Sequence, residues 1–210
     1  MEIDVNESGA RAERHAMGRR AVLGAGVGGV ALSLLPFLSG SAAAATLTAT
    51  TPPKRPTEAD TVLLAQAQQL ELTAQALYDV ALTVSGWTDE QAVVVTFLRE
   101  AHQAYANALS GLLGGAAPGV VSQAVLNALS GDFGESVEGV LAAAYGLEAS
   151  AVATHADVLS QIEGTDAASL IASIQMNEAR FGTVLADLAG NTDEADLLVT
   201  ADAESLVGKL

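Results

Sequence analysis

From residue 57 onward, apolar residues recur at alternating spacings of three and four, which is the period of an amphipathic α-helix. No stretch alternates every second residue, as a half-buried strand does. The pattern covers four long segments, near 57–84, 88–113, 136–163 and 166–189. It predicts an all-α fold class in which four long helices bury their apolar stripes against one another.

Local signals support these helix ends. Thr57 with Asp60, and Thr88 with Gln91, have the spacing of an N-cap and its N3 partner. Glycines stand where helix C-caps are expected, at Gly86, Gly114, Gly164 and Gly190.

The two halves of the helical region resemble each other. Leu70-Glu71 aligns with Leu147-Glu148 at a shift of 77 residues, and the helix that follows each pair aligns as well. A duplicated helical hairpin is the simplest account. Residues 115–135 join the halves, and within them 120–129 is expected to form a short helix that ends at Gly131. This segment reaches roughly 48 Å, against roughly 39 Å for a long helix, so it can cross the bundle from end to end.

The first 45 residues have the features of an export signal. Arg19 and Arg20 precede an apolar run, 21–38, and a string of small residues follows at 41–45. This order is typical of a Tat-type signal peptide, so we expect transient contact with the Tat translocon and then cleavage. The alternative is an uncut membrane anchor, because about eighteen apolar residues can just span a bilayer. With cleavage, no stable membrane anchor remains.

The expected domain order is therefore a signal peptide (1–45), a flexible linker (46–57), a four-helix bundle (58–190) and an acidic C-terminal tail (191–210), in which 197–199 is an apolar docking point. Exported protein would reside in the periplasm, the cell envelope or the extracellular space. The sequence gives no support for a homo-oligomer, which stays open.

Charge and composition exclude several functions. The formal net charge is −16, so the basic surface that nucleic-acid binding needs is missing. The chain has no cysteine, which excludes disulfides, thiolate catalysis and iron–sulfur ligation. Any metal ion must therefore be held by carboxylate, imidazole or phenolate groups.

Each predicted helix places one titratable residue on its apolar face. Because an unpaired buried carboxylate costs several kcal/mol, these groups should converge on a cation, on protons or on each other. Tyr78 and His155 follow two of them by seven residues, so they could hydrogen-bond the cluster from beside it. The predicted metal ligands are Glu71, His102, Glu148 and Glu178.

With these residues, the chain resembles the ferritin-like superfamily, and in particular the small exported bacterial ferritin-like domain proteins with a twin-arginine signal. The resemblance implies two helical hairpins joined by a long crossover. It also implies that Glu71 and Glu148 are the glutamate ligands of the first and third helices. The second and fourth helices should each carry a Glu-x-x-His pair. Here these positions read His102 with Tyr105, and Glu178 with Phe181.

The departures remove both ligand histidines, so a complete di-iron site is not expected. The remaining donors suit one iron, manganese or zinc ion, to which Tyr105 could add a phenolate. We expect metal binding without turnover and assign no catalytic residue. The alternative is a metal-free helical scaffold that serves envelope stress or protein interaction, in which the same groups bond to one another.

Overall fold

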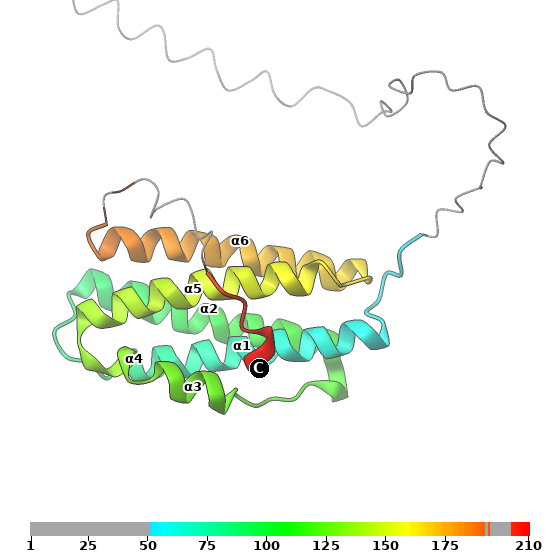
Figure 1. Ribbon diagram of the computed structural model, residues 1–210, viewed down its shortest axis with the longest axis horizontal. Helices are drawn as coiled ribbons and strands as arrows, with labels where there is room; N and C mark the ends of the chain where they lie inside the picture. Colours follow the sequence, from blue (N-terminus) through cyan, green and yellow to red (C-terminus); the bar gives the residue numbers. More distant parts are fainter. Residues whose placement is uncertain (1–50, 192, 194–202) are drawn as a thin grey trace, which may run out of the picture. The chain divides into compact units, whose positions relative to one another are not determined.

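The computed structural model describes residues 51–191, 193 and 203–210. Its four long helices are α1 (Glu58–Ala81), α2 (Asp89–Leu113), α5 (Val137–Leu159) and α6 (Thr165–Leu188). They pack as a bundle of two hairpins, α1 with α2 and α5 with α6 (Figure 1). The prediction of an all-α four-helix bundle is confirmed. The predicted signal, with Arg19 and Arg20, lies outside the described residues.

Capping boxes start the first two helices, as the sequence predicts. Thr57 Oγ1 accepts from Asp60 N at 3.2 Å, while Asp60 Oδ2 accepts from Thr57 N at 2.8 Å. Thr88 and Gln91 make the same reciprocal pair at the start of α2. Each box satisfies two backbone donors that the helix leaves unpaired.

The predicted glycine caps have mixed outcomes. Gly114 is the C-cap of α2, and Gly190 follows the C-cap of α6 with a φ of 79°. Gly164 instead is the N-cap of α6, because α5 ends at Leu159, earlier than predicted. The cause is a long-range contact: the buried Asp60 carboxylate accepts from Glu163 N at 2.8 Å and Gly164 N at 2.9 Å.

The segment between the hairpins crosses the length of the bundle, as predicted. It contains η1 (Gly114–Ala116), α3 (Gln123–Leu129) and α4 (Asp132–Glu135). Both α3 and α4 pack against α1, so that α5 begins at the same end of the bundle as α2 (Figure 1). The predicted short helix begins at residue 123 rather than 120. The turn of helix α4 was not predicted.

The predicted apolar stripes form the core, which has two large parts and a smaller third around Leu70 and Ala151. One large part is built around Ala74, Leu147 and Leu185, and the other around Leu64, Leu109 and Ile171. Between them, at the middle of the four helices, lies a layer of buried polar side chains. Among the described residues, no helix is both long enough and apolar enough to cross a membrane.

Both ends of the described chain are fastened to the bundle. Pro53 O accepts from Thr165 N, and Lys54 O accepts from Asp166 N, each at 3.0 Å. These carbonyls satisfy donors in the first turn of α6, so this part of the predicted flexible linker is held in place.

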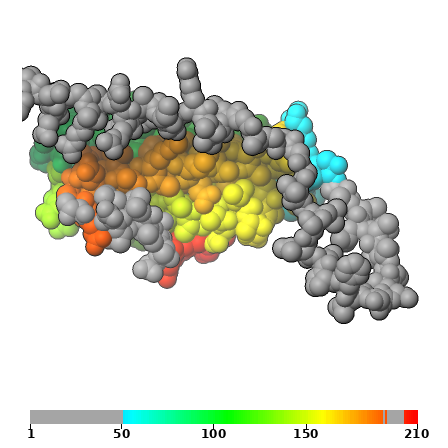
Figure 2. All heavy atoms as spheres, turned by 90° about the horizontal axis from the view of Figure 1, so that it is seen from above, coloured from blue at the N-terminus to red at the C-terminus, as the bar shows by residue number. Residues whose placement is uncertain are grey.

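The C-terminal segment, residues 203–210, includes η2 (Val207–Lys209) and runs from α5 toward α1 and α3 (Figure 1). In Figure 2 its red spheres lie next to those of α5. Leu206 N donates to Thr154 Oγ1 at 2.8 Å, and Ser122 Oγ donates to Lys209 O at 2.8 Å. The Leu206 side chain packs with Leu70 and Ala151. The docking point predicted at 197–199 lies outside the described residues. Leu206 is the anchor that the structure shows.

Candidate metal centre

A polar cluster at the middle of the bundle joins all four long helices. Helix α1 contributes a glutamate, α2 a histidine, α5 a glutamate and a histidine, and α6 a glutamate. Each of these side chains is fully buried: Glu71, His102, Glu148, His155 and Glu178. The four predicted metal ligands therefore do meet at one interior place, and His155 joins them.

His102 links two glutamates. Its Nδ1 lies 2.7 Å from Glu71 Oε2, and its Nε2 lies 3.0 Å from Glu148 Oε1. The Tyr78 hydroxyl donates to the same Glu148 Oε1 at 2.6 Å, and the Tyr78 ring stacks on the imidazole. Both ring nitrogens of His102 are thus engaged by carboxylates, and Tyr78 bonds the cluster as the sequence indicated.

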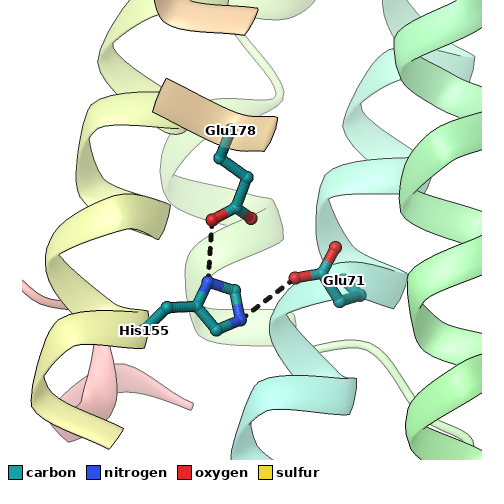
Figure 3. Close-up of side chains that lie close together, drawn as sticks. All are labelled: Glu71, His155 and Glu178. Atoms are coloured by element: carbon teal, nitrogen blue, oxygen red, sulfur yellow. Dashed lines mark hydrogen bonds and ion pairs between the residues drawn. The ribbon is translucent and has the colours of Figure 1, made fainter. Parts of the chain in front are cut away.

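His155 lies inside the cluster, although its spacing in the sequence predicts a place beside the ligands. Its Nδ1 is 2.8 Å from Glu178 Oε2, and its Nε2 is 3.2 Å from Glu71 Oε1. Figure 3 shows the ring between these two carboxylates. The second contact is an ion pair without hydrogen-bond geometry. The sequence signal for this position was the seven-residue spacing from Glu148, which puts both side chains on one helix face.

Tyr105, predicted to lie beside the ligands, adjoins the cluster through its ring. It contacts His102 with the edge of its ring, at a centroid distance of 6.1 Å, and stacks on Phe181 at 6.5 Å. Its hydroxyl bonds to Asn177. Burial raises the pKa of Tyr105 to about 12, which disfavours the phenolate that a metal ligand requires.

Burial and mutual charge set the protonation of the cluster. Burial alone would raise the pKa of Glu71, but the close contacts and charges of His102 and His155 outweigh it and hold that pKa at about 2. Burial would lower the pKa of His155, but Glu178 and Glu71 raise it to about 10. The pKa of His102 is also raised well above its usual value, despite burial, by Glu148 and Glu71. Both rings are therefore cationic at neutral pH.

The pKa of Glu178 is raised to about 7, mainly by burial and further by the charges of Glu71 and Glu148, although His155 opposes the change. Burial and Glu148 raise the pKa of Tyr78 well above its usual value, so this side chain remains a neutral donor. The cluster thus holds two cationic rings among three carboxyl groups. One of these carboxyl groups, Glu178, is partly protonated near neutral pH.

Several atoms in this layer have unused bonding capacity. Glu71 Oε1, Glu148 Oε2, Glu178 Oε1 and His155 Nε2 are buried and make no hydrogen bond. Buried polar atoms without partners are rare and costly, and a cation is one way to satisfy them. Among the residues that the structure describes, Glu71, His155 and Glu178 can each offer one ligand atom, all within 4.8 Å of one another. The donors present therefore fit a single metal ion.

This grouping differs from the predicted ligand set. Glu71 and Glu178 belong to both. His155 offers the nitrogen in place of His102: both nitrogens of His102 hydrogen-bond to carboxylates, whereas His155 Nε2 makes no hydrogen bond. Glu148 lies in the same layer, with one oxygen bonded to Tyr78 and His102 and the other without a partner.

A four-helix bundle with a long crossover and a central carboxylate–histidine layer defines a ferritin-like protein. The model of the ferritin-like domain family matches residues 59–191, and the chain belongs to this family. No curated protein and no solved structure matches the chain.

The departures from the family pattern are visible in the structure. At the two positions where the resemblance implies histidine ligands, Tyr105 and Phe181 instead stack on each other with an interplanar angle of 15°. Phe181 also meets Phe97 edge-on. Aromatic packing thus takes the place of two nitrogen donors on the α2–α6 side of the cluster.

Proposed function

We propose that this protein binds a single metal ion in the bundle core through Glu71, His155 and Glu178, and that it works outside the cytoplasm. The observation that carries the proposal is the set of buried atoms without hydrogen-bond partners, which includes Glu71 Oε1, His155 Nε2 and Glu178 Oε1. A ligand set of carboxylate oxygens and one imidazole nitrogen suits iron, manganese or zinc.

The contacts of His155 support a ligand role. Its Nδ1 bonds to Glu178 Oε2, which fixes the orientation of the ring and leaves Nε2 to face the ion. A histidine ligand commonly has this kind of carboxylate partner on its other nitrogen. Because Nε2 carries a proton in the metal-free cluster, binding must release that proton. A bound divalent cation would supply positive charge among the three carboxylates.

We assign binding and no turnover. The ligand atoms come from side chains with no exposed surface, and the three atoms lie within 4.8 Å of one another, which suits one ion. On the α2–α6 side, the stacked rings of Tyr105 and Phe181 adjoin the cluster. Sequestration or carriage of a metal ion outside the cytoplasm fits these features.

Export is supported by the sequence: Arg19-Arg20, the apolar run that follows, and the small residues at 41–45. We propose recognition by the Tat translocon and cleavage near residue 45. Replacing both arginines by lysine should retain the protein in the cytoplasm, whereas the wild type should be recovered outside it with its N-terminus near residue 46. Mass spectrometry of each fraction measures both. Recovery of the uncut wild-type chain in the membrane would contradict the proposal.

The metal proposal is tested by elemental analysis of the exported protein and by titration of chelator-treated protein with Mn²⁺, Fe²⁺ or Zn²⁺. We expect one ion per chain in the wild type, and loss of at least tenfold in affinity for His155→Ala and Glu178→Ala. Glu138→Ala is the matched control, because this exposed acid on α5 lies outside the cluster. Equal binding by control and cluster variants would refute the assignment.

The second candidate is a metal-free helical scaffold. It is favoured by the two imidazole rings, which already bond to the carboxylates and balance much of their charge. Absence of any stoichiometric metal from folded wild-type protein, before and after titration, would support this reading.

A further inference from the structure

We infer that the imidazole of His102 stands in the place of a second cation and thereby limits the cluster to one metal ion. The inference rests on the proposed function, since it concerns the number of ions that the same layer accepts. It comes from the position of the ring between the carboxylates of α1 and α5.

The two nitrogens of His102 use the oxygens that a second ion would need. The two oxygens of the Glu71 carboxylate contact different histidines: Oε2 contacts His102, and Oε1 contacts His155. Glu148 Oε1 is bonded to both His102 and Tyr78, which leaves one oxygen of that carboxylate without a partner. A single carboxylate oxygen is too few ligands for a protein metal site.

The ring is held in this position by its neighbours. Tyr78 stacks on it with ring centroids 5.5 Å apart, and Tyr105 and Phe181 meet it edge-on at 6.1 and 6.4 Å. His102 has no exposed surface. A side chain packed in this way cannot swing aside to admit an ion without disturbing three aromatic contacts.

Removal of the ring should therefore create a second site. In His102→Ala, Glu71 Oε2 and Glu148 Oε1 would lose their imidazole partner, and Glu148 Oε2 already has no hydrogen-bond partner. Titration of chelator-treated protein with Mn²⁺ alone should give one ion per chain for the wild type and two for the variant. Electron paramagnetic resonance should show dipolar coupling between the two Mn²⁺ ions only in the variant.

Two further variants keep the experiment decisive. His102→Ala leaves buried carboxylates without their counter-ion and could fail to fold in the absence of metal. His102→Asn retains a donor near the position of Nδ1 and removes only the contact of Nε2 with Glu148 Oε1, which still accepts from Tyr78, so it should fold and bind the second ion more weakly than His102→Ala. Leu109→Ala is the matched control, since it removes a buried side chain from the same helix without releasing any carboxylate. It should still bind one ion.

The outcomes separate this inference from the proposed function. One ion in the wild type and one in both folded His102 variants would overturn the inference and leave the proposed function intact. No ion in the wild type but binding in the His102 variants would refute the proposed function, and it would also overturn the limit of one ion that the inference states. Two ions in the wild type would overturn the inference, and no binding by any protein would refute both.

Discussion

Alkaline conditions should lower the free energy of unfolding of the metal-free protein, and the size of this decrease follows from the pKa values of the cluster. The ordinary pKa of a histidine is 6.5, whereas that of His155 in the folded protein is about 10. Between these values the folded chain keeps a proton that the unfolded chain loses. Stability from this group is thus fully present below pH 6.5 and declines as pH rises toward 10.

One extra bound proton changes the free energy of unfolding by about 1.4 kcal/mol per pH unit. From pH 6.5 to 8.5, and allowing for half-protonation of the unfolded histidine at the start, His155 alone accounts for a loss of about 2 kcal/mol. His102, whose pKa is also raised, acts in the same direction. Glu178 does too, because its pKa rises from 4.5 to about 7, so its contribution declines as pH rises through that interval.

The contribution of Glu71 to stability depends on pH in the opposite direction. Its pKa is lowered from 4.5 to about 2, so its stabilising contribution is present above pH 4.5 and is lost as pH falls toward 2. The stability of the metal-free protein should consequently be greatest near pH 4.5, where the Glu71 contribution is complete, and should fall as pH rises, first through Glu178 and above pH 6.5 through the histidines as well.

Urea denaturation of chelator-treated protein at half-unit pH steps measures this profile, with circular dichroism as the signal. His155→Gln should reduce the fall between pH 6.5 and 8.5 by about 2 kcal/mol, while Gln103→Ala, at an exposed position on α2, should leave the profile unchanged. A free energy of unfolding that is constant or increasing across that interval would show that the rings are not cationic in the folded protein.

Three other substitutions test the packing that supports the site. Gly164→Ala should cost roughly 1–3 kcal/mol, because a Cβ there would lie 2.8 Å from Arg55 O and 2.9 Å from Asp60 Oδ2, whereas Gly146→Ala, on an open helix face, should gain about 0.5–1 kcal/mol. Thermal and urea denaturation compare the pair, and equal effects would contradict the clash. Leu206→Ala should cost about 2 kcal/mol and speed amide exchange in the C-terminal segment. The exposed control Val120→Ala should stay within about 0.5 kcal/mol of wild type. Thr88→Ala should lower stability by about 1 kcal/mol through loss of its capping box, and an unchanged urea midpoint would show that α2 does not depend on that cap.

The sequence predicted the parts of the fold that depend on local chemistry. The starts of α1 and α2 follow from Thr57 and Thr88, whose partners lie three residues away. The end of α5 could not be predicted from neighbouring residues. It depends on Asp60, about a hundred residues earlier, whose carboxylate binds the backbone of the α5–α6 loop. Local propensity contains no information about such a contact.

The site shows the same division. Helical periodicity was enough to place Glu71, His102, Glu148 and Glu178 on inward faces, and the structure brings them to one layer. Periodicity also put His155 on the inward face of α5. It could not show that the His155 ring would lie between carboxylates of α1 and α6, because this depends on side-chain rotamers and on the relative heights of separate helices.

The hydrogen bonds from α6 to the segment before α1 set a boundary for protein engineering. The carbonyls of Pro53 and Lys54 accept hydrogen bonds from the first turn of α6, the helix that carries Glu178. An expression version that starts at residue 52 keeps these two acceptors, whereas one that starts at the first residue of α1 discards them, together with the Thr57 cap. Shortening the chain to its helices alone would therefore loosen the helix that carries one of the proposed ligands, at a place distant from the cut in sequence.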